Sequence, residues 1–113
     1  MSVSFHGIGQ VCATFLGAGV AEGQVVKMSG RGTVGPCGDG DSFCGVAVCV
    51  KDDACSVQVD GFVTVGYTGT VPTMGYTTLA ANGSGGVKTA STGGISCLVA
   101  DADTTAKTVT IKL

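Results

Sequence analysis

The chain has 113 residues, a mass of 11.0 kDa and a formal net charge of −2 at pH 7, which is typical of one domain. Its pI of about 4.9 excludes the basic surface that binds nucleic-acid phosphates. Hydrophobic residues reach 44%, too many for a disordered protein, yet no apolar run is as long as a membrane-spanning helix of about 20 residues. We therefore expect neither nucleic acid nor a membrane as a partner.

The residue types favour strands over helices. Glycine accounts for 20 residues, and glutamate, which is common on helix surfaces, occurs only as Glu22. Valine and threonine are abundant, and their branched side chains favour extended backbone. The glycines separate apolar runs without a period of three, which excludes collagen and predicts tight turns. We predict an all-β protein, a small compact β-barrel or sandwich-like domain.

Residues 1–20 differ from the rest of the chain because they are apolar, glycine-rich and without a regular period. We predict either an N-terminal arm or a strand exchanged with a neighbour, followed by a single β-barrel-like domain over residues 21–113. The start lacks the basic residues of a secretory signal peptide, so we expect a protein made in the cytoplasm. The candidate residues for intermolecular contact are Val3, Phe5, Ile8, Val11, Phe15 and Leu16.

Two hairpins are predicted in the first half of the remaining chain. Residues 24–28 and 33–37 are short apolar runs that flank a glycine-containing turn. Residues 43–50 form another run, and a polar turn joins it to residues 55–67. This last segment alternates between apolar and mostly polar positions, as a half-buried strand does. Asp60-Gly61 in its middle predicts a bulge or a sharp bend.

The second half repeats this pattern. Residues 75–80 and 87–90 are predicted strands on either side of a turn rich in glycine, and residues 95–99 follow a second such turn. A polar turn is predicted at residues 101–106, before a last strand at residues 109–113 in which apolar and polar side chains alternate. Short strands at this spacing are typical of a small barrel or sandwich.

Motifs that suggest chemistry have simpler interpretations. Residues 30–35 match G-x-G-x-x-G, but Pro36 follows where a dinucleotide site needs a helix, so these glycines predict a turn. The acidic residues at 39–41 and 101–103 are too few for a calcium loop. His6 is the only histidine, and a lone histidine near a terminus is more often a surface group than a catalytic base. We expect no enzymatic activity, metal or cofactor.

The cysteines do not form the paired knuckles of a zinc site. Because several occupy apolar positions of predicted strands, we favour buried free thiols; one or two disulfides are the next interpretation, and a metal site is the last. The six cysteines are Cys12, Cys37, Cys44, Cys49, Cys55 and Cys97.

Three segments carry a resemblance to a known family. Residues 21–28 give an A-x-G-x-V-V opening, residues 44–48 contain a G-V-A strand, and residues 57–63 give a V-x-V-x-G strand. Over about residues 20–113, the chain resembles the small head-decoration (capsid-stabilising) proteins of tailed bacteriophages and prophages. It departs from them in its six cysteines and its glycine-rich first twenty residues.

The resemblance implies a non-enzymatic structural protein, with a β-barrel-like domain that binds the major capsid protein on the exterior of the virion. It further implies a homo-oligomer, most often a trimer, made in the cytoplasm of a bacterial host. No catalytic or cofactor residue is carried over. The alternative is a small β-barrel module that binds a ligand or a carbohydrate.

Overall fold

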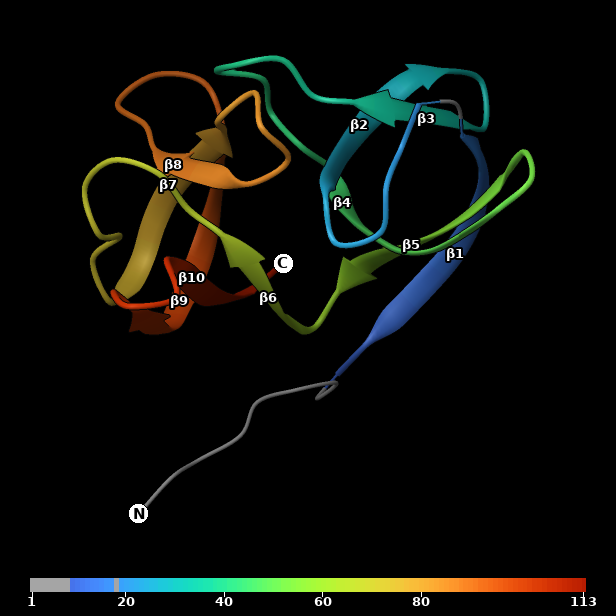
Figure 1. Cartoon of the computed structure of the whole chain (residues 1–113). Coiled ribbons are helices and arrows are strands. Elements are labelled where there is room, and N and C mark those ends of the chain that lie inside the picture. The colour runs from blue at the N-terminus through green and yellow to red at the C-terminus, as the bar shows by residue number, and fades with distance from the viewer. Residues whose placement is uncertain (1–8, 18) are drawn as a thin grey trace.

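The computed structural model describes residues 9–17 and 19–113, and every regular element in these ranges is a β-strand (Figure 1). The all-β prediction is confirmed. The strands are β1 (Val11–Gly17), β2 (Val25–Gly30), β3 (Thr33–Pro36), β4 (Gly45–Lys51), β5 (Ala54–Asp60), β6 (Phe62–Gly66), β7 (Gly75–Ala81), β8 (Val87–Thr89), β9 (Ile95–Asp103) and β10 (Thr108–Lys112). The described residues contain no helix that is long and apolar enough to cross a membrane.

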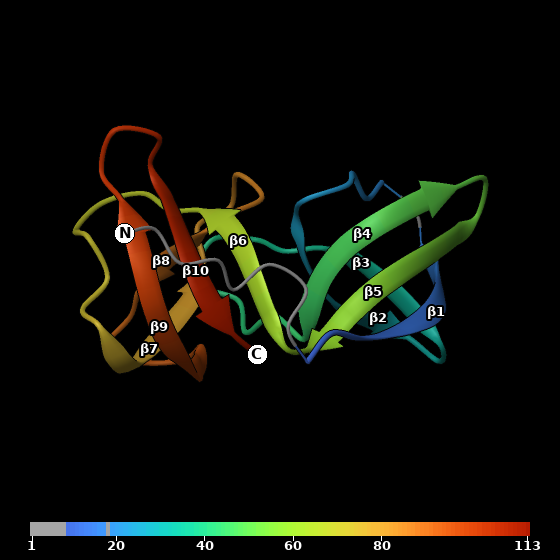
Figure 2. The ribbon, with the colours of Figure 1, turned by 90° about the horizontal axis from the view of Figure 1, so that it is seen from below.

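The strands divide into two lobes that lie side by side (Figures 1 and 2). The first five form a closed barrel in the order β1-β3-β2-β4-β5, and the last five form a sheet in the order β6-β10-β9-β7-β8. The two outer strands of this sheet curl toward each other, because Tyr67, directly after β6, forms a parallel bridge with Val87 of β8. The predicted small barrel is therefore confirmed for the first half of the chain.

The predicted hairpins are confirmed at β2–β3, β4–β5 and β7–β8, where consecutive strands pair antiparallel. The prediction of a turn at residues 101–106 is wrong in its first half. Asp101 pairs with Thr110, and Ala102 with Val109, so β9 continues to Asp103. The polar residues there lie at the exposed end of a long hairpin, where side-chain polarity does not separate strand from turn.

Residues 11–17 of the segment predicted as an arm or exchanged strand are β1, which pairs within the same chain. β1 runs antiparallel to β5 over Val11–Leu16 and parallel to β3 at Leu16 and Gly17 only. Phe15 packs against the barrel core. The boundary predicted at residue 20 therefore falls inside the barrel, between its first and second strands.

Two hydrophobic cores share a wall made of β2 and β4. Along each strand, neighbouring side chains point to opposite faces. Val25 and Val46 pack in the core of the second lobe, whereas Val26 and Ala47 pack inside the barrel. All four are almost fully buried. The sequences of β2 and β4 therefore contain consecutive apolar residues, as expected for strands that are buried on both faces.

Gly61 marks the point where the chain passes from the barrel to the second sheet. Its φ of 92° lies in the region that favours glycine. An added Cβ would lie 2.5 Å from the carbonyl oxygen of Gly9, so no larger residue fits there without displacing the backbone. The predicted bend at Asp60-Gly61 is confirmed, and it separates β5 from β6.

The central position of β10 gives a test of this packing. Ile111 is fully buried between the sheet and the core, so Ile111→Ala should lower the free energy of unfolding by about 2–5 kcal/mol. The neighbouring Thr110 faces outward, and its hydroxyl is 2.9 Å from that of Thr64. Thr110→Ala should therefore cost less than about 1.5 kcal/mol. Urea denaturation measures both, and equal losses would contradict the assigned faces of β10.

Candidate functional site

A pocket of about 470 Å³ lies where the two lobes meet. β4, β5 and β6 form its walls, and residues before β1 and β2 complete it. The apolar side chains that line it are Val46, Ala47, Val48, Phe62 and Val63, and the polar ones are Gln10, Glu22, Gln58 and Thr64. Small-molecule sites often have this size and mixed character, so the pocket is the candidate ligand site.

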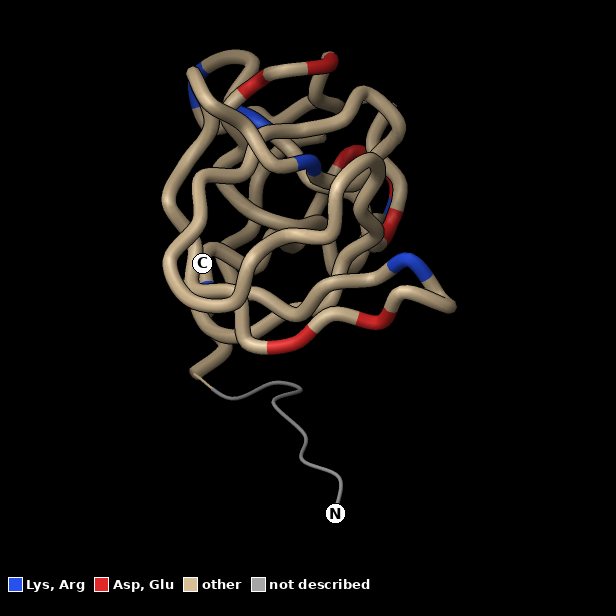
Figure 3. The backbone as a smooth tube through the Cα atoms, turned by 90° about the vertical axis from the view of Figure 1, so that its left-hand side faces the viewer, with Lys and Arg blue, Asp and Glu red and all other residues tan. Residues whose placement is uncertain are grey.

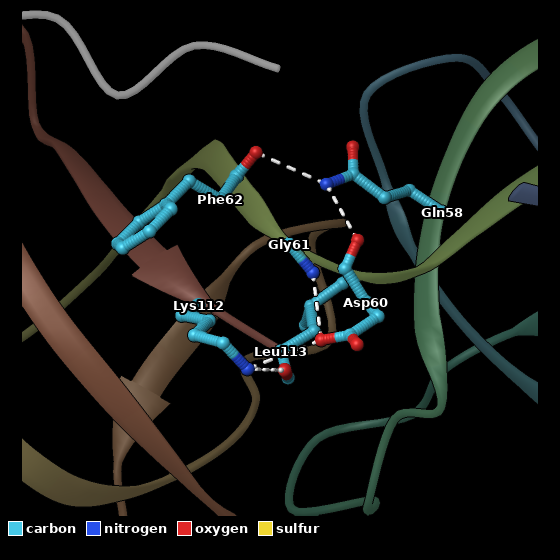
Figure 4. A network of polar contacts seen from close by, with 6 residues as sticks. All are labelled: Gln58, Asp60, Gly61, Phe62, Lys112 and Leu113. Carbon is cyan, nitrogen blue, oxygen red and sulfur yellow. Dashed lines mark hydrogen bonds and ion pairs between the residues drawn. The ribbon is translucent and has the colours of Figure 1, made fainter. Parts of the chain in front are cut away.

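Gln58 connects the two lobes at this pocket, as Figure 4 shows. Its side chain is 2% exposed, and its Nε2 donates to the carbonyl oxygens of Asp60 at 3.1 Å and of Phe62 at 3.0 Å. Its Oε1 accepts a hydrogen bond of 3.3 Å from Nε2 of Gln10. Because a buried amide must be hydrogen-bonded, this one side chain fixes the backbone on both sides of Gly61.

The C-terminal residues are attached to the same junction (Figure 4). Asp60 Oδ1 accepts hydrogen bonds from the backbone N–H of Gly61 at 2.8 Å and from Nζ of Lys112 at 3.2 Å. These contacts, the Gly61 bond first, lower the pKa of Asp60. The backbone N–H of Leu113 donates to the carbonyl oxygen of Gly61 at 3.1 Å. The bend is thus held from β5 and from the end of β10.

The pocket offers shape and hydrogen bonding but little acid–base chemistry. Among the described residues that line it, Glu22 is the only ionisable one. Nucleophilic catalysis requires a nucleophile and a base within hydrogen-bond reach of each other, and the pocket lining does not place such a pair. Nor do residues 9–17 and 19–113 contain a group of three or more side chains arranged to hold a metal ion.

The acidic residues at 39–41 stabilise the loop between β3 and β4 and do not form a ligand site. Asp39 forms a 2.7 Å ion pair with Lys88 of β8, and Asp41 forms a 2.5 Å ion pair with Lys27 of β2. Asp41 also accepts the backbone N–H of Gly38. The hydrogen bond from Lys27 lowers the pKa of Asp41, and the same contact raises that of Lys27. These pairs attach the β3–β4 loop to both lobes.

Two glycine-containing segments are turns. The G-x-G-x-x-G match falls on the β2–β3 hairpin, where Gly32 has a φ of 59°, as its interpretation as a turn predicted. Asn82 lies in the β7–β8 turn, and its Oδ1 accepts the backbone N–H groups of Ser84 and Gly86. In both segments, the residues serve to form the turn itself.

The six thiols are free in the structure. Burial is confirmed for Cys55 and Cys97, Cys37 and Cys44 are half-buried, and Cys12 and Cys49 are exposed. The last two are exposed because their strands turn them away from the barrel core. Burial raises the pKa of Cys97 to about 11. Burial is also the main reason that the pKa of Cys37 is raised to about 11. It also raises the pKa of Cys44 and Cys55.

The predicted contact residues do not form one cluster. Val3, Phe5 and Ile8 lie outside the described residues, as does His6. The other three are on β1: Val11 is 51% exposed and Leu16 is 58% exposed, whereas Phe15 packs on the core. Because side chains alternate along a strand, Leu16 faces the side opposite to Val11 and Phe15.

A second exposed apolar region, which the sequence pattern did not predict, lies near the start of β7. Val71, Met74 and Tyr76 are all exposed there, and Tyr76 reaches 76%. In the sheet register, Tyr76 is opposite Leu98, which is opposite Lys112. Charged residues are few and of mixed sign along the chain (Figure 3). On the outer face of the second sheet, these apolar side chains therefore share the surface with Asp101, Asp103 and Lys112.

Replacing the buried amide tests its role at the junction. Gln58→Met keeps the size of the side chain but leaves two carbonyl groups without their donor, so the free energy of unfolding should fall by about 1–3 kcal/mol. The control is Gln10→Met, which removes only the long 3.3 Å bond and should cost less. Urea denaturation measures both variants, and a larger loss for Gln10→Met would contradict the assigned network.

Thiol labelling tests the burial of the cysteines. At about pH 8, a thiol with a raised pKa is almost wholly protonated and unreactive. Iodoacetamide should therefore modify Cys12 and Cys49 first, and the other four only on unfolding. Raising the pH toward 11 should increase the labelling of Cys37 in the folded protein, since it then becomes a thiolate. Peptide mass mapping measures this order, and uniform labelling of all six would contradict it.

Comparisons with known proteins give no family assignment. A scan against models of protein families finds no match to the chain, and a search of curated proteins finds none.

Proposed function

We propose that the protein is a non-enzymatic structural protein that decorates and stabilises the outside of the capsid shell of a tailed phage or prophage. The observation that carries the proposal is β1, an exposed strand on a rigid barrel, with Leu16 uncovered on the face that points away from the barrel core. The sequence resemblance over residues 20–113 supplies the class of partner, which is the major capsid protein.

The architecture suits attachment to a larger surface. A protein that stabilises a shell must transmit force without deforming, and the two cores on one shared wall make a stiff body. The exposed side chain of Leu16 on the outward face of β1 offers an apolar contact for a shell protein, and this contact does not use the backbone groups at the edge of the strand. Several weak contacts of this kind become strong when a homo-oligomer presents them together, and the resemblance implies a trimer.

The chemistry of the described residues supports a binding role. The pocket lining contributes Glu22 as its ionisable group. Burial raises the pKa values of the half-buried Cys37 and Cys44, which makes them poor nucleophiles near neutral pH. Asp39 and Asp41 are engaged with lysines.

The decisive experiment uses capsid shells that lack this protein, purified from the phage or prophage that encodes it. The wild-type chain should sediment with these shells and raise their melting temperature. Leu16→Asp places a charge on the exposed side of β1 and should weaken binding by about tenfold or more. Thr92→Asp, at an exposed turn in the other lobe, is the control and should bind as wild type does.

Two outcomes would contradict the proposal. One is that the wild-type protein fails to bind the shells, and the other is that Leu16→Asp binds as well as Thr92→Asp does. Light scattering of the free protein adds an independent check of assembly, since the expected trimer has three times the mass of the 11.0 kDa chain.

The second candidate is a module that binds a small ligand, which the junction pocket favours. Its volume of about 470 Å³ is large enough for a monosaccharide, and Phe62 and Gln58 in its lining offer an apolar surface beside polar groups. A panel of monosaccharides titrated into labelled protein tests this function by NMR. Saturable shifts of the Gln58 and Gln10 side-chain amides would support it, and the absence of shifts would exclude the sugars tested.

A further inference from the structure

Half of β1 has a strand neighbour on one side only. β5 pairs with it along Val11–Leu16, but β3 reaches it only at Leu16 and Gly17. In the part of the chain that the structure describes, no strand pairs with residues 11–15 on the side away from β5. Figures 1 and 2 place this strand on the outside of the barrel lobe. Val11, Cys12, Ala13 and Thr14 are all exposed.

The direction of the backbone groups on this edge follows from the bonds at its end. The N–H of Gly17 donates to Asp53 beside β5, and the N–H of Leu16 donates to Gly32 beside β3. Because the groups alternate along a strand, the N–H and C=O of Cys12 and Thr14 point to the open side. The edge therefore presents a ladder of donors and acceptors ready for another strand.

This edge lacks the protection that proteins give to exposed strands. Charged residues and proline normally prevent edge strands from pairing, but the first 21 residues contain no Asp, Glu, Lys, Arg or Pro. The edge strand β8 of the second sheet differs. It carries Lys88 in an ion pair with Asp39, and it bridges to Tyr67. An uncharged, unprotected edge of this length is expected to be covered by a strand.

We propose that β1 of a second copy of this chain covers the edge, running antiparallel about a two-fold axis at Ala13. The unpaired stretch is residues 11–15, and Ala13 is its centre, so this register uses the whole edge and stops before β3 begins. Cys12 and Thr14 of the two copies then exchange backbone hydrogen bonds. The two barrels become one continuous sheet across the axis.

The side chains agree with this register. Val11 of one copy lies opposite Phe15 of the other, on the face that Phe15 turns toward the barrel core. The pairing thus covers Val11, which is half exposed in the single chain. Ala13 meets its own copy at the axis, where a small side chain permits close approach. Cys12 and Thr14 lie on the opposite face, and neither carries a charge.

The inference goes beyond the proposed function, because it requires no capsid. A two-fold contact through β1 is also compatible with a trimer that forms through another surface, since a symmetric assembly combines different axes through different interfaces. In that case β1 would join the protomers of neighbouring trimers. A disulfide across the two-fold axis detects the pairing whether or not a trimer is present.

A disulfide at the axis tests the register. In antiparallel strands, opposite residues that are not hydrogen-bonded to each other have Cα atoms about 4.5 Å apart, which suits a disulfide. Ala13→Cys, in a background with Cys12→Ser and Cys49→Ser, should form a covalent dimer under mild oxidation. Thr92→Cys in the same background is the control. Non-reducing electrophoresis should show at least about tenfold faster dimer formation for Ala13→Cys.

Equal rates of dimer formation for the two cysteine variants would overturn the proposal. A second experiment removes one of the backbone hydrogen-bond donors at the edge. Thr14→Pro removes the N–H that points to the open edge and leaves the ladder with β5 intact, whereas Thr14→Ala keeps this N–H. Sedimentation at increasing concentration should show weaker association for Thr14→Pro only. Unchanged association of a folded Thr14→Pro variant would also overturn it, and if this variant does not fold, the disulfide result decides.

Discussion

The whole structure depends on one wall of two strands that is buried on both faces. Val25 and Val46 point from it into the second lobe, and Val26 and Ala47 point into the barrel. A shift of one residue in the register of either strand would exchange the two sets of side chains. The wall therefore links the two cores. The barrel core consists of barrel residues alone, whereas the second lobe takes Val25, Phe43 and Val46 of its core from the first half of the chain.

The junction adds a directional constraint to this packing. Gly61 allows the turn between the sheets, and Gln58 binds the carbonyl groups on both sides of it. The pocket opens beside these residues, so its shape follows from how the lobes are joined. A ligand bound there would contact the connection itself, and the exposed strand β1 begins a short distance away at Val11.

The local part of the fold was predictable from the sequence, but the division into two sheets was not. Alternation over residues 55–67 and the glycine at Gly61 predicted a strand with a bend. β5 pairs with its predicted neighbour β4, but it also pairs with β1, and β6 pairs with β10. β1 and β10 are far away in the sequence, and no local signal identifies them. For the same reason, residues 11–17 were predicted as an arm or exchanged strand, although β5 pairs with them. Gln58 gave no signal either, because a glutamine on the polar side of an alternating strand normally faces solvent.

The sharing of core residues has a consequence for synthesis on the ribosome. Residues 11–60 complete the barrel, and they leave the ribosome before the strands that follow Gly61. Until those strands arrive, Val25, Phe43 and Val46 have no core to enter, so the nascent chain presents an apolar face to the cell. This face stays exposed at least until residues 62–113 have been synthesised, which takes about 3–10 seconds at about 5–20 residues per second. Chaperones that act during translation therefore have a defined surface and a short interval in which to bind it.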